Sequence, residues 1–529
     1  MPMNKKLAIV LVLLFAVLMS VPWLVPHMGW LALVGFVPLL CLDRIASLTG
    51  QKHFFWWQYA AFVLWNAITT FWVCNATVGG AVFAVLANAA QMALIWALFR
   101  LSKKKFSGVV PYIFLAVMWI AWERHYFDVQ ISWPWLTLGN AFARTTSLVQ
   151  WYELTGSLGG SLWIWAVNLG VFGLMTALSD GSWQCWNGKA RLASALGLGL
   201  VLAGPVIASE IRYANYEEDS CGKVDVLIAQ PNFDPYQKFQ SMTQAQQNEV
   251  LLDLLDCPEA DGRLLIAPET FTGDIWLNYV EAGPTVQSFR EFLAAHPSSD
   301  LLFGASTYRF YDQYAAPSPL ARSVQNGGWT TSHNSALLLG DSRPAQIYHK
   351  SKLVVGTELT PYPKLFVPID DKLGGVMGRC EGQKEISLLN YRDSIPFGCA
   401  VCYESVYGEY ATDYVRKGAE FLTVITNDAW WGDTPGYRQH LSYSSLRAIE
   451  LRRDVARCGN TGISAIIDQK GDIIEQTQWW QPATIVSSVN RSRAVTPFVR
   501  YGDVVGRICT LAFLLLAAAL LVSLFKVRR

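Results

Sequence analysis

The chain has 529 residues, of which 52% are hydrophobic and only 16% are charged, and it contains 22 tryptophans. This length exceeds what one hydrophobic core normally supports, and the composition is typical of a protein partly solvated by lipid. The 42 Lys and Arg residues nearly cancel the 41 Asp and Glu residues, which leaves a net charge of +1. Because there is also no long basic run, the sequence argues against a nucleic-acid-binding or other polyanion-binding protein.

Eight apolar runs approach the length that crosses a bilayer, which is about 20 residues each. We expect spans at residues 7–25, 28–43, 54–74, 78–100, 109–127, 158–178, 192–210 and 506–525, of which the second is the shortest. The sequence therefore predicts three parts. Residues 1–210 form a membrane domain with about seven transmembrane helices, residues 211–504 form an extracytoplasmic domain, and residues 505–529 form a last transmembrane helix with a cytoplasmic tail.

Basic residues fall on alternate connections between these spans, which predicts the orientation because Lys and Arg near span ends stay in the cytoplasm. These connections carry Lys5, Lys6, Arg44, Lys52, Arg100, Lys103, Lys104, Lys105, Lys189, Arg191, Lys526, Arg528 and Arg529. The opposite connections before residue 211 carry only Arg144. Both termini are thus expected in the cytoplasm. The alternative is that residues 5–25 form a cleaved signal peptide, although no small-residue cleavage site is evident.

Residues 224–490 show a different pattern, in which short apolar runs alternate with polar stretches compatible with helices. Candidate strands lie at residues 224–230, 263–269, 301–306, 334–340, 395–404, 420–428 and 462–468. Their nearly continuous apolar character predicts an α/β domain whose sheet is buried on both faces. Residues 437–454 have the periodicity of a helix, with cationic side chains expected on its outer face.

Two of the candidate strands end in reactive side chains, Glu269 and Cys402. Ligand chemistry in α/β sheets tends to lie beyond the carboxyl ends of strands, so the two side chains are candidates for one site. A thiol needs a base or a cation to react as thiolate, and Glu269 is a candidate base. Lys350 is a candidate for stabilising the oxygen anion of a tetrahedral intermediate. Each residue alone also fits an ordinary exposed side chain, and Lys352 would share a strand face with Lys350.

Several words in this segment resemble the nitrilase, or carbon-nitrogen hydrolase, superfamily. They are APETF (267–271), HNSALLL (333–339), YHKSKLV (348–354), CYES (402–405), NDAWWG (427–432), RQH (438–440), RAIE (447–450) and NTGISAIID (460–468). Together with the expected spans and SWPWL at residues 132–136, the chain is similar to the bacterial apolipoprotein N-acyltransferase family.

The resemblance implies an α-β-β-α sandwich with Glu269 as general base, Lys350 as oxyanion-stabilising lysine and Cys402 as nucleophile. It also implies that Glu358 positions the lysine and that Tyr403 and Glu404 support the nucleophile. Trp430 and Trp431 are candidates for binding the acyl chain, with core packing as the other interpretation. The chain departs from the family at LVVGTE (353–358), where the family often has LVPFGE, so the local backbone is in question.

The implied reaction moves a fatty acyl group from a phospholipid, expected to be phosphatidylethanolamine, through a Cys402 thioester. The acceptor is the N-terminal amine of a diacylglyceryl-cysteine in a lipoprotein. No metal, nucleotide or other cofactor is expected, and neither an H-E-x-x-H nor a G-x-S-x-G motif is present. The expected location is the bacterial inner membrane, with a periplasmic catalytic domain and a monomeric enzyme.

Three alternatives remain open at the level of sequence. A membrane-tethered hydrolase of the nitrilase type would use the same triad and pass the acyl group to water. A binding protein would retain the fold without its chemistry. In addition, Cys399 and Cys402 have the C-x-x-C spacing of a redox pair, although a disulfide there would block the proposed nucleophile.

Overall fold

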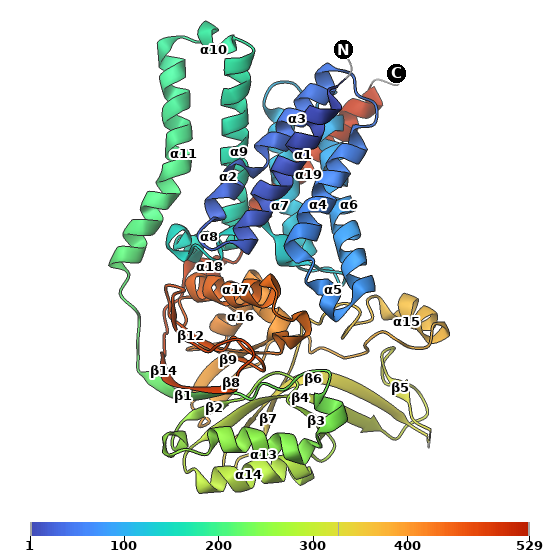
Figure 1. Cartoon of the computed structure of the whole chain (residues 1–529), viewed down its shortest axis with the longest axis vertical. Coiled ribbons are helices and arrows are strands. Elements are labelled where there is room, and N and C mark those ends of the chain that lie inside the picture. The colour runs from blue at the N-terminus through green and yellow to red at the C-terminus, as the bar shows by residue number, and fades with distance from the viewer. Residues whose placement is uncertain (1–2, 326, 527–529) are drawn as a thin grey trace. The chain divides into compact units, whose positions relative to one another are not determined.

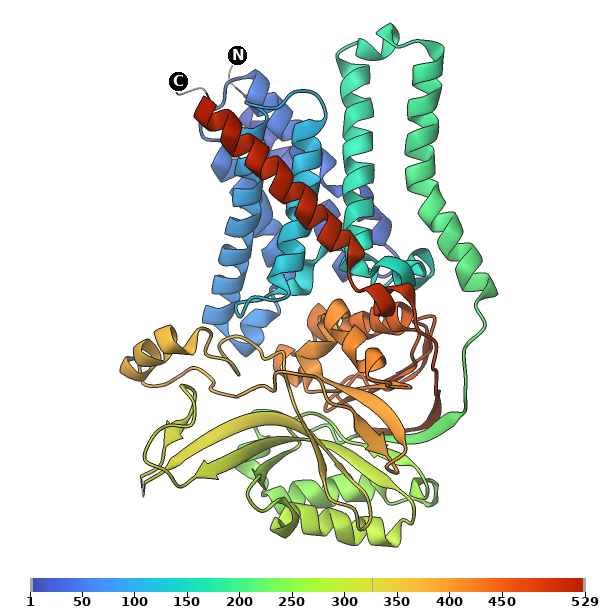
Figure 2. The same cartoon turned by 180° about the vertical axis from the view of Figure 1, so that it is seen from behind.

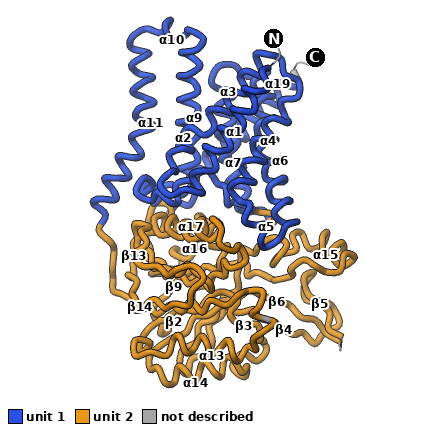
Figure 3. The backbone as a smooth tube through the Cα atoms, in the orientation of Figure 1, with its two compact units in different colours: residues 1–129, 133–216, 501–529 blue, residues 130–132, 217–500 orange. Residues whose placement is uncertain are grey.

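The computed structural model describes residues 3–325 and 327–526. It divides into two compact units, coloured separately in Figure 3. The helical unit comprises residues 1–129, 133–216 and 501–529, and the α/β unit comprises residues 130–132 and 217–500. Arg528 and Arg529, two of the basic residues expected in the cytoplasm, lie outside the described residues.

The helical unit is built from long helices joined by short ones (Figure 1). The helices are α1 (Lys5–Leu24), α2 (Ala32–Gly35), α3 (Val37–Leu48), α4 (Phe54–Thr70), α5 (Val73–Ala76), α6 (Val78–Ser102), α7 (Val110–Tyr126), α8 (Tyr152–Thr155), α9 (Ser157–Ser179), α10 (Ser182–Cys185), α11 (Gly188–Asn215) and α19 (Val504–Lys526). Short 3-10 turns lie between them at Gly29–Leu31, Pro134–Leu136, Leu138–Phe142 and Thr146–Val149.

Six segments of the described chain are long and apolar enough to cross a membrane. They are Lys5–Leu24, Gly29–Leu48, Val78–Ser102, Ser157–Ser179, Gly188–Asn215 and Val504–Phe525. The spans expected at residues 54–74 and 109–127 are also helical, but α4 and α7 each have only 17 residues. The prediction of several apolar helices is therefore confirmed, whereas the number of eight spans stays a prediction.

The interior of the helical unit is rich in aromatic rings, and its outer surface is apolar. Phe36 stacks on Trp165 with ring centroids 4.4 Å apart, and it also contacts Trp96 and Trp119. On α11, which lies beside α9 in Figures 1 and 2, Leu200 is 72% exposed. An apolar exterior over whole helices is what lipid, and not water, would solvate.

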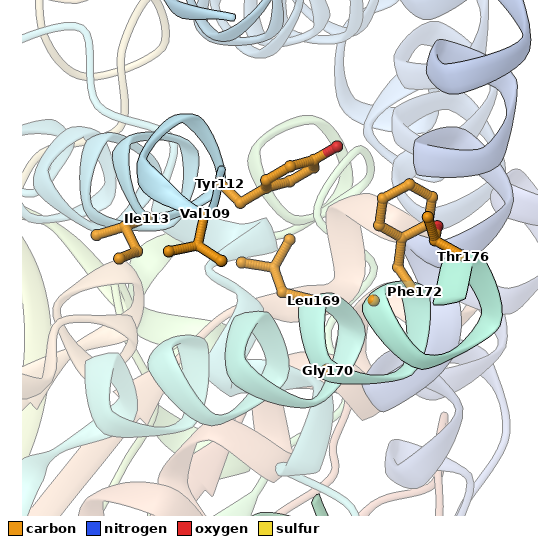
Figure 4. A pocket seen from close by; sticks show the side chains of 8 residues that line it. Val109, Tyr112, Ile113, Leu169, Gly170, Phe172 and Thr176 are labelled. Atoms are coloured by element: carbon orange, nitrogen blue, oxygen red, sulfur yellow. The ribbon is translucent and has the colours of Figure 1, made fainter. Parts of the chain in front are cut away.

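A cavity of about 350 Å³ lies between α7 with its preceding turn and α9 (Figure 4). Its lining is almost entirely apolar, with Tyr112 and Thr176 as the polar members. The remaining lining residues are Val109, Ile113, Leu169, Gly170, Phe172 and Gly173. The cavity offers neither a nucleophile nor a carboxylate, so it is not a candidate for the chemistry predicted from the sequence.

The α/β unit contains two sheets. The first has the order β14-β1-β2-β4-β6-β5, with β3 paired to β4 and β7 paired to β6, and the second has the order β13-β12-β11-β10-β9-β8. The strands are β1 (Lys223–Gln230), β2 (Leu264–Ile266), β3 (Thr272–Trp276), β4 (Asp300–Tyr311), β5 (Arg322–Ser323), β6 (Trp329–Leu339), β7 (Gln346–His349), β8 (Leu389–Tyr391), β9 (Ile395–Val401), β10 (Leu422–Thr426), β11 (Val455–Gly459), β12 (Ala465–Ile467), β13 (Ile473–Gln476) and β14 (Ala483–Asn490).

Helices cover the outer faces of both sheets, which gives four layers. The helices of this unit are α12 (Lys238–Ser241), α13 (Gln244–Leu255), α14 (Pro284–Ala295), α15 (Pro363–Lys372), α16 (Gly408–Arg416), α17 (Pro435–Leu451) and α18 (Pro497–Tyr501). Alternation along the strands separates the layers: Ile228 faces the core between the sheets, and Leu227 faces the core under α13 and α14. A third core lies under α16 and α17. The predicted α-β-β-α architecture is thereby confirmed.

The expectation of outward cations on residues 437–454 holds for Arg438, which is exposed, and is wrong for the other three arginines. The helix is α17, and Arg447 on it is buried, as are Arg452 and Arg453 just after it. Arg447 forms an ion pair with Glu450 at 2.8 Å, and Arg453 donates to the carbonyl of Ala419. Buried charges of this kind are tolerated because they are paired, which periodicity alone does not reveal.

Candidate active site

The three predicted catalytic residues all follow strands of the α/β unit. Glu269 follows β2 across Ala267 and Pro268, Lys350 comes directly after β7, and Cys402 comes directly after β9. The first two strands belong to one sheet and β9 belongs to the other. The sandwich therefore brings residues distant in sequence to the same end of its inner layers.

Lys350 lies between two carboxylates in a buried cluster. Its Nζ atom is 2.9 Å from Oε1 of Glu269 and 2.9 Å from Oε1 of Glu358. The side-chain amide of Asn334 donates to the same two oxygens, at 2.8 and 2.6 Å. The backbone N–H of Asn427 donates to the other oxygen of Glu269 at 3.1 Å. Four polar side chains are thus fixed in one arrangement.

The charges in this cluster support one another. Burial opposes the charged form of Lys350, but the negative charges of Glu269 and Glu358 outweigh it and raise the pKa of the lysine well above its usual value. Lys350 is therefore a permanent cation at neutral pH. A fixed cation held in a water-poor pocket can stabilise a developing oxyanion more strongly than one in water.

Cys402 occupies a sharp strand-to-helix turn. Its φ of +52° lies in the left-handed region, which a residue with a Cβ seldom adopts. The turn continues as the 3-10 helix η7 (Cys402–Val406). Such backbone strain persists only where surrounding contacts over-determine it, and it often marks a reactive side chain.

The Cys402 thiol is neutral at rest. Burial and the negative charge of Glu269 raise its pKa well above the usual value, and the positive charge of Lys350 only partly opposes this. That Glu269 and Lys350 both act on the thiol places the three groups in one site. A neutral thiol beside a carboxylate needs proton transfer to the carboxylate during its attack, and it is not stored as thiolate.

The predicted supporting residues lie around the same turn. Glu404 is fully buried, and its carboxylate accepts from the hydroxyl of Tyr348 at 2.7 Å and from the backbone N–H groups of Ser351 and Val401, at 2.7 and 2.8 Å. It thus joins the segment that carries Lys350 to the strand that carries Cys402. Tyr403 donates its hydroxyl hydrogen to the carbonyl of Ser132 at 3.1 Å.

The two candidate substrate tryptophans lie on the 3-10 helix η8 (Asp428–Trp431). Trp430 is partly exposed, and its ring meets that of Tyr236 edge-on with centroids 5.3 Å apart. The ring of Trp431 meets that of His440 at 5.6 Å. Lys352, the competitor of Lys350, lies with its Nζ atom 5.0 Å from the ring centroid of Tyr407. The structure therefore joins Lys350, and not Lys352, to Glu269.

Sequence reasoning named no role for Asn334, Asn427, Asp428 or His440, although all four lie within words that resemble the nitrilase superfamily. The sequence did not indicate a role for Asn334, because it lies in a strand with an apolar run, where a polar amide has no evident function. The sequence did not indicate a role for His440 either, because the periodicity of its helix predicted only an apolar face. The motifs shared with the nitrilase superfamily were the available signal, because they contain polar residues that core packing alone does not require.

Among the described residues, one group of three side chains has the spacing of a metal site. Ligand atoms of Cys402, Asp428 and His440 all lie within 4.8 Å of one another. However, the guanidinium of Arg457 is 2.6 Å from Asp428. A cation already pairs this carboxylate, so the group is poorly suited to a metal ion. All ten cysteines are described and each is a free thiol, so no disulfide joins Cys399 to Cys402 in this structure.

Comparisons with known proteins match both parts of the chain. The carbon-nitrogen hydrolase family matches residues 228–496, and the family described as apolipoprotein N-acyltransferase N-terminal domain matches residues 15–170. The apolipoprotein N-acyltransferase of Chlorobaculum tepidum is 28% identical over 504 residues, covering 92% of this chain and 91% of the relative. That of Geobacter metallireducens is 26% identical over 525 residues, covering 96% and 94%.

Among solved structures, a mutant of an amidase of the nitrilase superfamily from Nesterenkonia AN1 aligns with 54% of this chain and 96% of its own, at 14% identity and a TM-score of 0.36. The match over residues 228–496 spans more than half of the chain and contains Glu269, Lys350 and Cys402. The chain therefore belongs to the carbon-nitrogen hydrolase family, with an N-terminal region like that of the apolipoprotein N-acyltransferases.

Proposed function

We propose that this protein is a phospholipid:apolipoprotein N-acyltransferase, the enzyme of the last step in lipoprotein maturation. The observation that carries the proposal is the buried Glu269–Lys350–Glu358 cluster beside the Cys402 thiol, in a chain that also has six apolar helices of membrane-spanning length. Relatives named apolipoprotein N-acyltransferase match the chain over most of its length. Membrane helices give a carbon-nitrogen hydrolase domain access to substrates that stay in the bilayer.

In the first half-reaction, the sulfur of Cys402 attacks the ester carbonyl carbon of a phospholipid while Glu269 accepts the thiol proton. Lys350 stabilises the negative charge on the carbonyl oxygen. The intermediate collapses when the C–O bond to glycerol breaks, and Glu269 returns the proton to the leaving oxygen. A lysophospholipid departs and Cys402 holds the acyl group as a thioester.

In the second half-reaction, the free amine of a diacylglyceryl-cysteine attacks the thioester carbonyl. Glu269 accepts a proton from the nitrogen, Lys350 again stabilises the oxyanion, and the C–S bond breaks. The sulfur regains the proton from Glu269, and the product is an amide. Glu358 holds the lysine throughout by accepting from its ammonium, and Asn334 holds the base by donating to Glu269 and to Glu358.

The finer features of the proposal concern location and substrates. Phosphatidylethanolamine is the proposed acyl donor, Trp430 and Trp431 line the proposed acyl-chain path, and Tyr403 and Glu404 support the turn that carries Cys402. We further propose about eight spans, with residues 211–504 on the periplasmic side of a bacterial inner membrane and both termini in the cytoplasm. The alternation of Lys and Arg between connections supports this orientation. The protein is proposed to act as a monomer.

The test uses purified protein with phosphatidylethanolamine vesicles and a synthetic diacylated lipopeptide, with products followed by mass spectrometry. We expect a triacylated lipopeptide and an equal amount of lysophospholipid. The Cys402→Ala variant is the control and should form neither. Release of free fatty acid without any triacylated product would instead favour the hydrolase, in which water takes the place of the amine.

A further inference from the structure

The nucleophile turn rests on the polar side of α17, and this side has no part in the reaction proposed above. Arg447 of α17 donates to the carbonyls of Ser405 and Val406, at 3.3 and 2.7 Å, near the far end of the turn. About two helical turns earlier, Nε2 of His440 lies 3.1 Å from the carbonyl oxygen of Cys402 itself. Arg447 and His440 are buried polar groups on this side of the helix, and unpaired they would be costly, so they need these partners.

His440 is held in place from its other side by a buried carboxylate. Its Nδ1 atom is 2.9 Å from Oδ1 of Asp428, and this oxygen also accepts from the hydroxyl of Thr426 at 2.6 Å. The second oxygen of Asp428 accepts from Arg457 at 2.6 Å. His440, Asp428 and Arg457 are all completely buried. The imidazole is therefore held with Nδ1 against the carboxylate and Nε2 against the nucleophile turn, where Nε2 also lies 3.0 Å from the hydroxyl oxygen of Ser405. Because a carbonyl oxygen only accepts, the contact with Cys402 requires a hydrogen on Nε2.

The charges of this network are consistent with that orientation. Burial disfavours the ionised form of Asp428, but the positive charges of His440 and Arg457 outweigh it and lower the pKa of the carboxyl. Asp428 is therefore an anion that receives three donors. An ionised, fully paired carboxylate is a rigid acceptor, since any rotation of the imidazole would leave a buried charge without its hydrogen bond.

We infer that His440 is a positioning residue for acyl transfer, which holds the carbonyl of Cys402 and so fixes the left-handed backbone that aims the sulfur at the substrate. The inference rests on the proposed function of the same site. His440 acts through Cys402, whose carbonyl has His440 and the hydroxyl of Ser405, at 2.8 Å, as its side-chain donors.

The physical reason is that Cys402 would leave its strained conformation if these contacts were lost. A left-handed backbone is unfavourable for a residue with a Cβ. Release of the carbonyl would let the turn relax and move the sulfur by a fraction of an ångström to an ångström. Misplacement of a nucleophile by about 1 Å can slow a reaction by about 100-fold. Substrate binding, which uses other groups, would change little.

The experiment compares His440→Gln with His440→Asn. The amide nitrogen of Gln reaches the position of Nε2 and can donate to the carbonyl of Cys402, whereas that of Asn reaches the position of Nδ1 and can donate only to Asp428. The rate of Cys402 acylation is measured by mass spectrometry in a single turnover with phosphatidylethanolamine vesicles, and KM is measured in steady state. We expect the Gln variant within about fivefold of wild type and the Asn variant about 100-fold slower, with KM changed less than about threefold in both.

His296→Asn is the matched control, because His296 also lies against aspartates, with ring nitrogens 3.0 Å from Asp261 and 3.4 Å from Asp256. We expect its acylation rate to equal that of wild type. Equal rates for the Gln and Asn variants, a slower Gln variant, or a control as slow as His440→Asn would overturn the inference. A wild type that forms no acyl-cysteine would instead overturn the proposed function.

Ser405→Ala provides an independent test if the histidine variants do not accumulate. It removes the other donor to the Cys402 carbonyl, together with the 3.0 Å contact between the Ser405 hydroxyl and Nε2 of His440, and leaves the contacts of the imidazole with Asp428 and the Cys402 carbonyl. We expect the acylation rate to fall by about tenfold with an unchanged KM, because one of two donors to the carbonyl is lost. An unchanged acylation rate would overturn the inference.

Discussion

The helical unit and the α/β unit differ in the side chains that they bury and in those that they expose. In the helical unit, aromatic rings such as Phe36 and Trp165 fill the interior, and aliphatic side chains such as Leu200 form the surface. In the α/β unit, apolar side chains fill three cores, and between them lie fully buried ions such as Lys350 and Arg457. Each of these two ions has a carboxylate partner within 3 Å.

This difference indicates which surroundings each unit requires. A surface of exposed leucine is stable where the solvent is lipid, so the helical unit needs a bilayer. Buried ions are stable where each is paired, so the α/β unit can maintain a water-poor site with charges in fixed positions. The first unit supplies access to lipids and the second supplies electrostatic stabilisation. The predictions below test this division.

The largest effect is expected from Lys350. Replacing it with Met keeps the length of the side chain and removes the ammonium, so acyl transfer should fall by about 100- to 1,000-fold, as for loss of an oxyanion-hole donor. Lys352→Met is the matched control and should lower kcat/KM less than about tenfold, because Lys352 contacts the ring of Tyr407, whereas the lysine paired with Glu269 is Lys350. Equal losses of kcat/KM in both variants would show that the buried ammonium of Lys350 does not stabilise the oxyanion.

A second pair of substitutions tests the surfaces of the two units. Leu200 on α11 and Ile474 on β13 are both exposed, at 72% and 63%. Leu200→Arg should lower membrane insertion by about 2.5–3.5 kcal/mol if the residue lies near the centre of a span, whereas Ile474→Arg should change stability by less than about 0.5 kcal/mol. The measurements are the inserted fraction in a translocation assay and the thermal midpoint. Equal tolerance of both would contradict a lipid-facing α11.

A smaller effect concerns the pH dependence of Cys402 labelling by iodoacetamide. Because burial and Glu269 raise the pKa of this thiol, the thiolate fraction at pH 7 lies below that of an ordinary cysteine. The alkylation rate should therefore increase about tenfold per pH unit from pH 7 to above pH 9 without a plateau. Peptide mass spectrometry gives the rate, with the exposed thiol of Cys221 as an internal reference. A plateau below pH 8 would mean that Lys350 stabilises a resting thiolate.

Hydropathy and strand patterns predicted the parts of the fold that depend on apolar burial. The strands at residues 224–230 and 334–340 correspond closely to β1 and the end of β6. In contrast, β11 was not predicted, because its central Arg457 is unlike a buried strand residue until its pairing with Asp428 is known. Strand β14 was not predicted either, since its partly exposed face interrupts the apolar pattern, whereas the strand considered around Lys350 ends just before it, as β7.

The candidate site shows the same limit. Glu269 and Cys402 were found because each follows an apolar strand, and Lys350 was separated from Lys352 only by resemblance. The contacts of Asn334 and His440 depend on which strands become neighbours across the sandwich. Sequence spacing does not contain that information. In the sequence, such contacts are indicated only by a polar residue within an apolar segment.

The central claim is that sulfur in the α/β unit carries a fatty acyl group taken from phospholipid. The direct measurement is the mass of the proteolytic peptide that contains Cys402, after incubation of the purified protein with phosphatidylethanolamine vesicles. The account predicts the added mass of one acyl chain that hydroxylamine removes, with far less of it in Glu269→Gln and none in Cys402→Ala. An acyl group on another residue, or a Cys402→Ala variant that still forms triacylated lipopeptide, would contradict it.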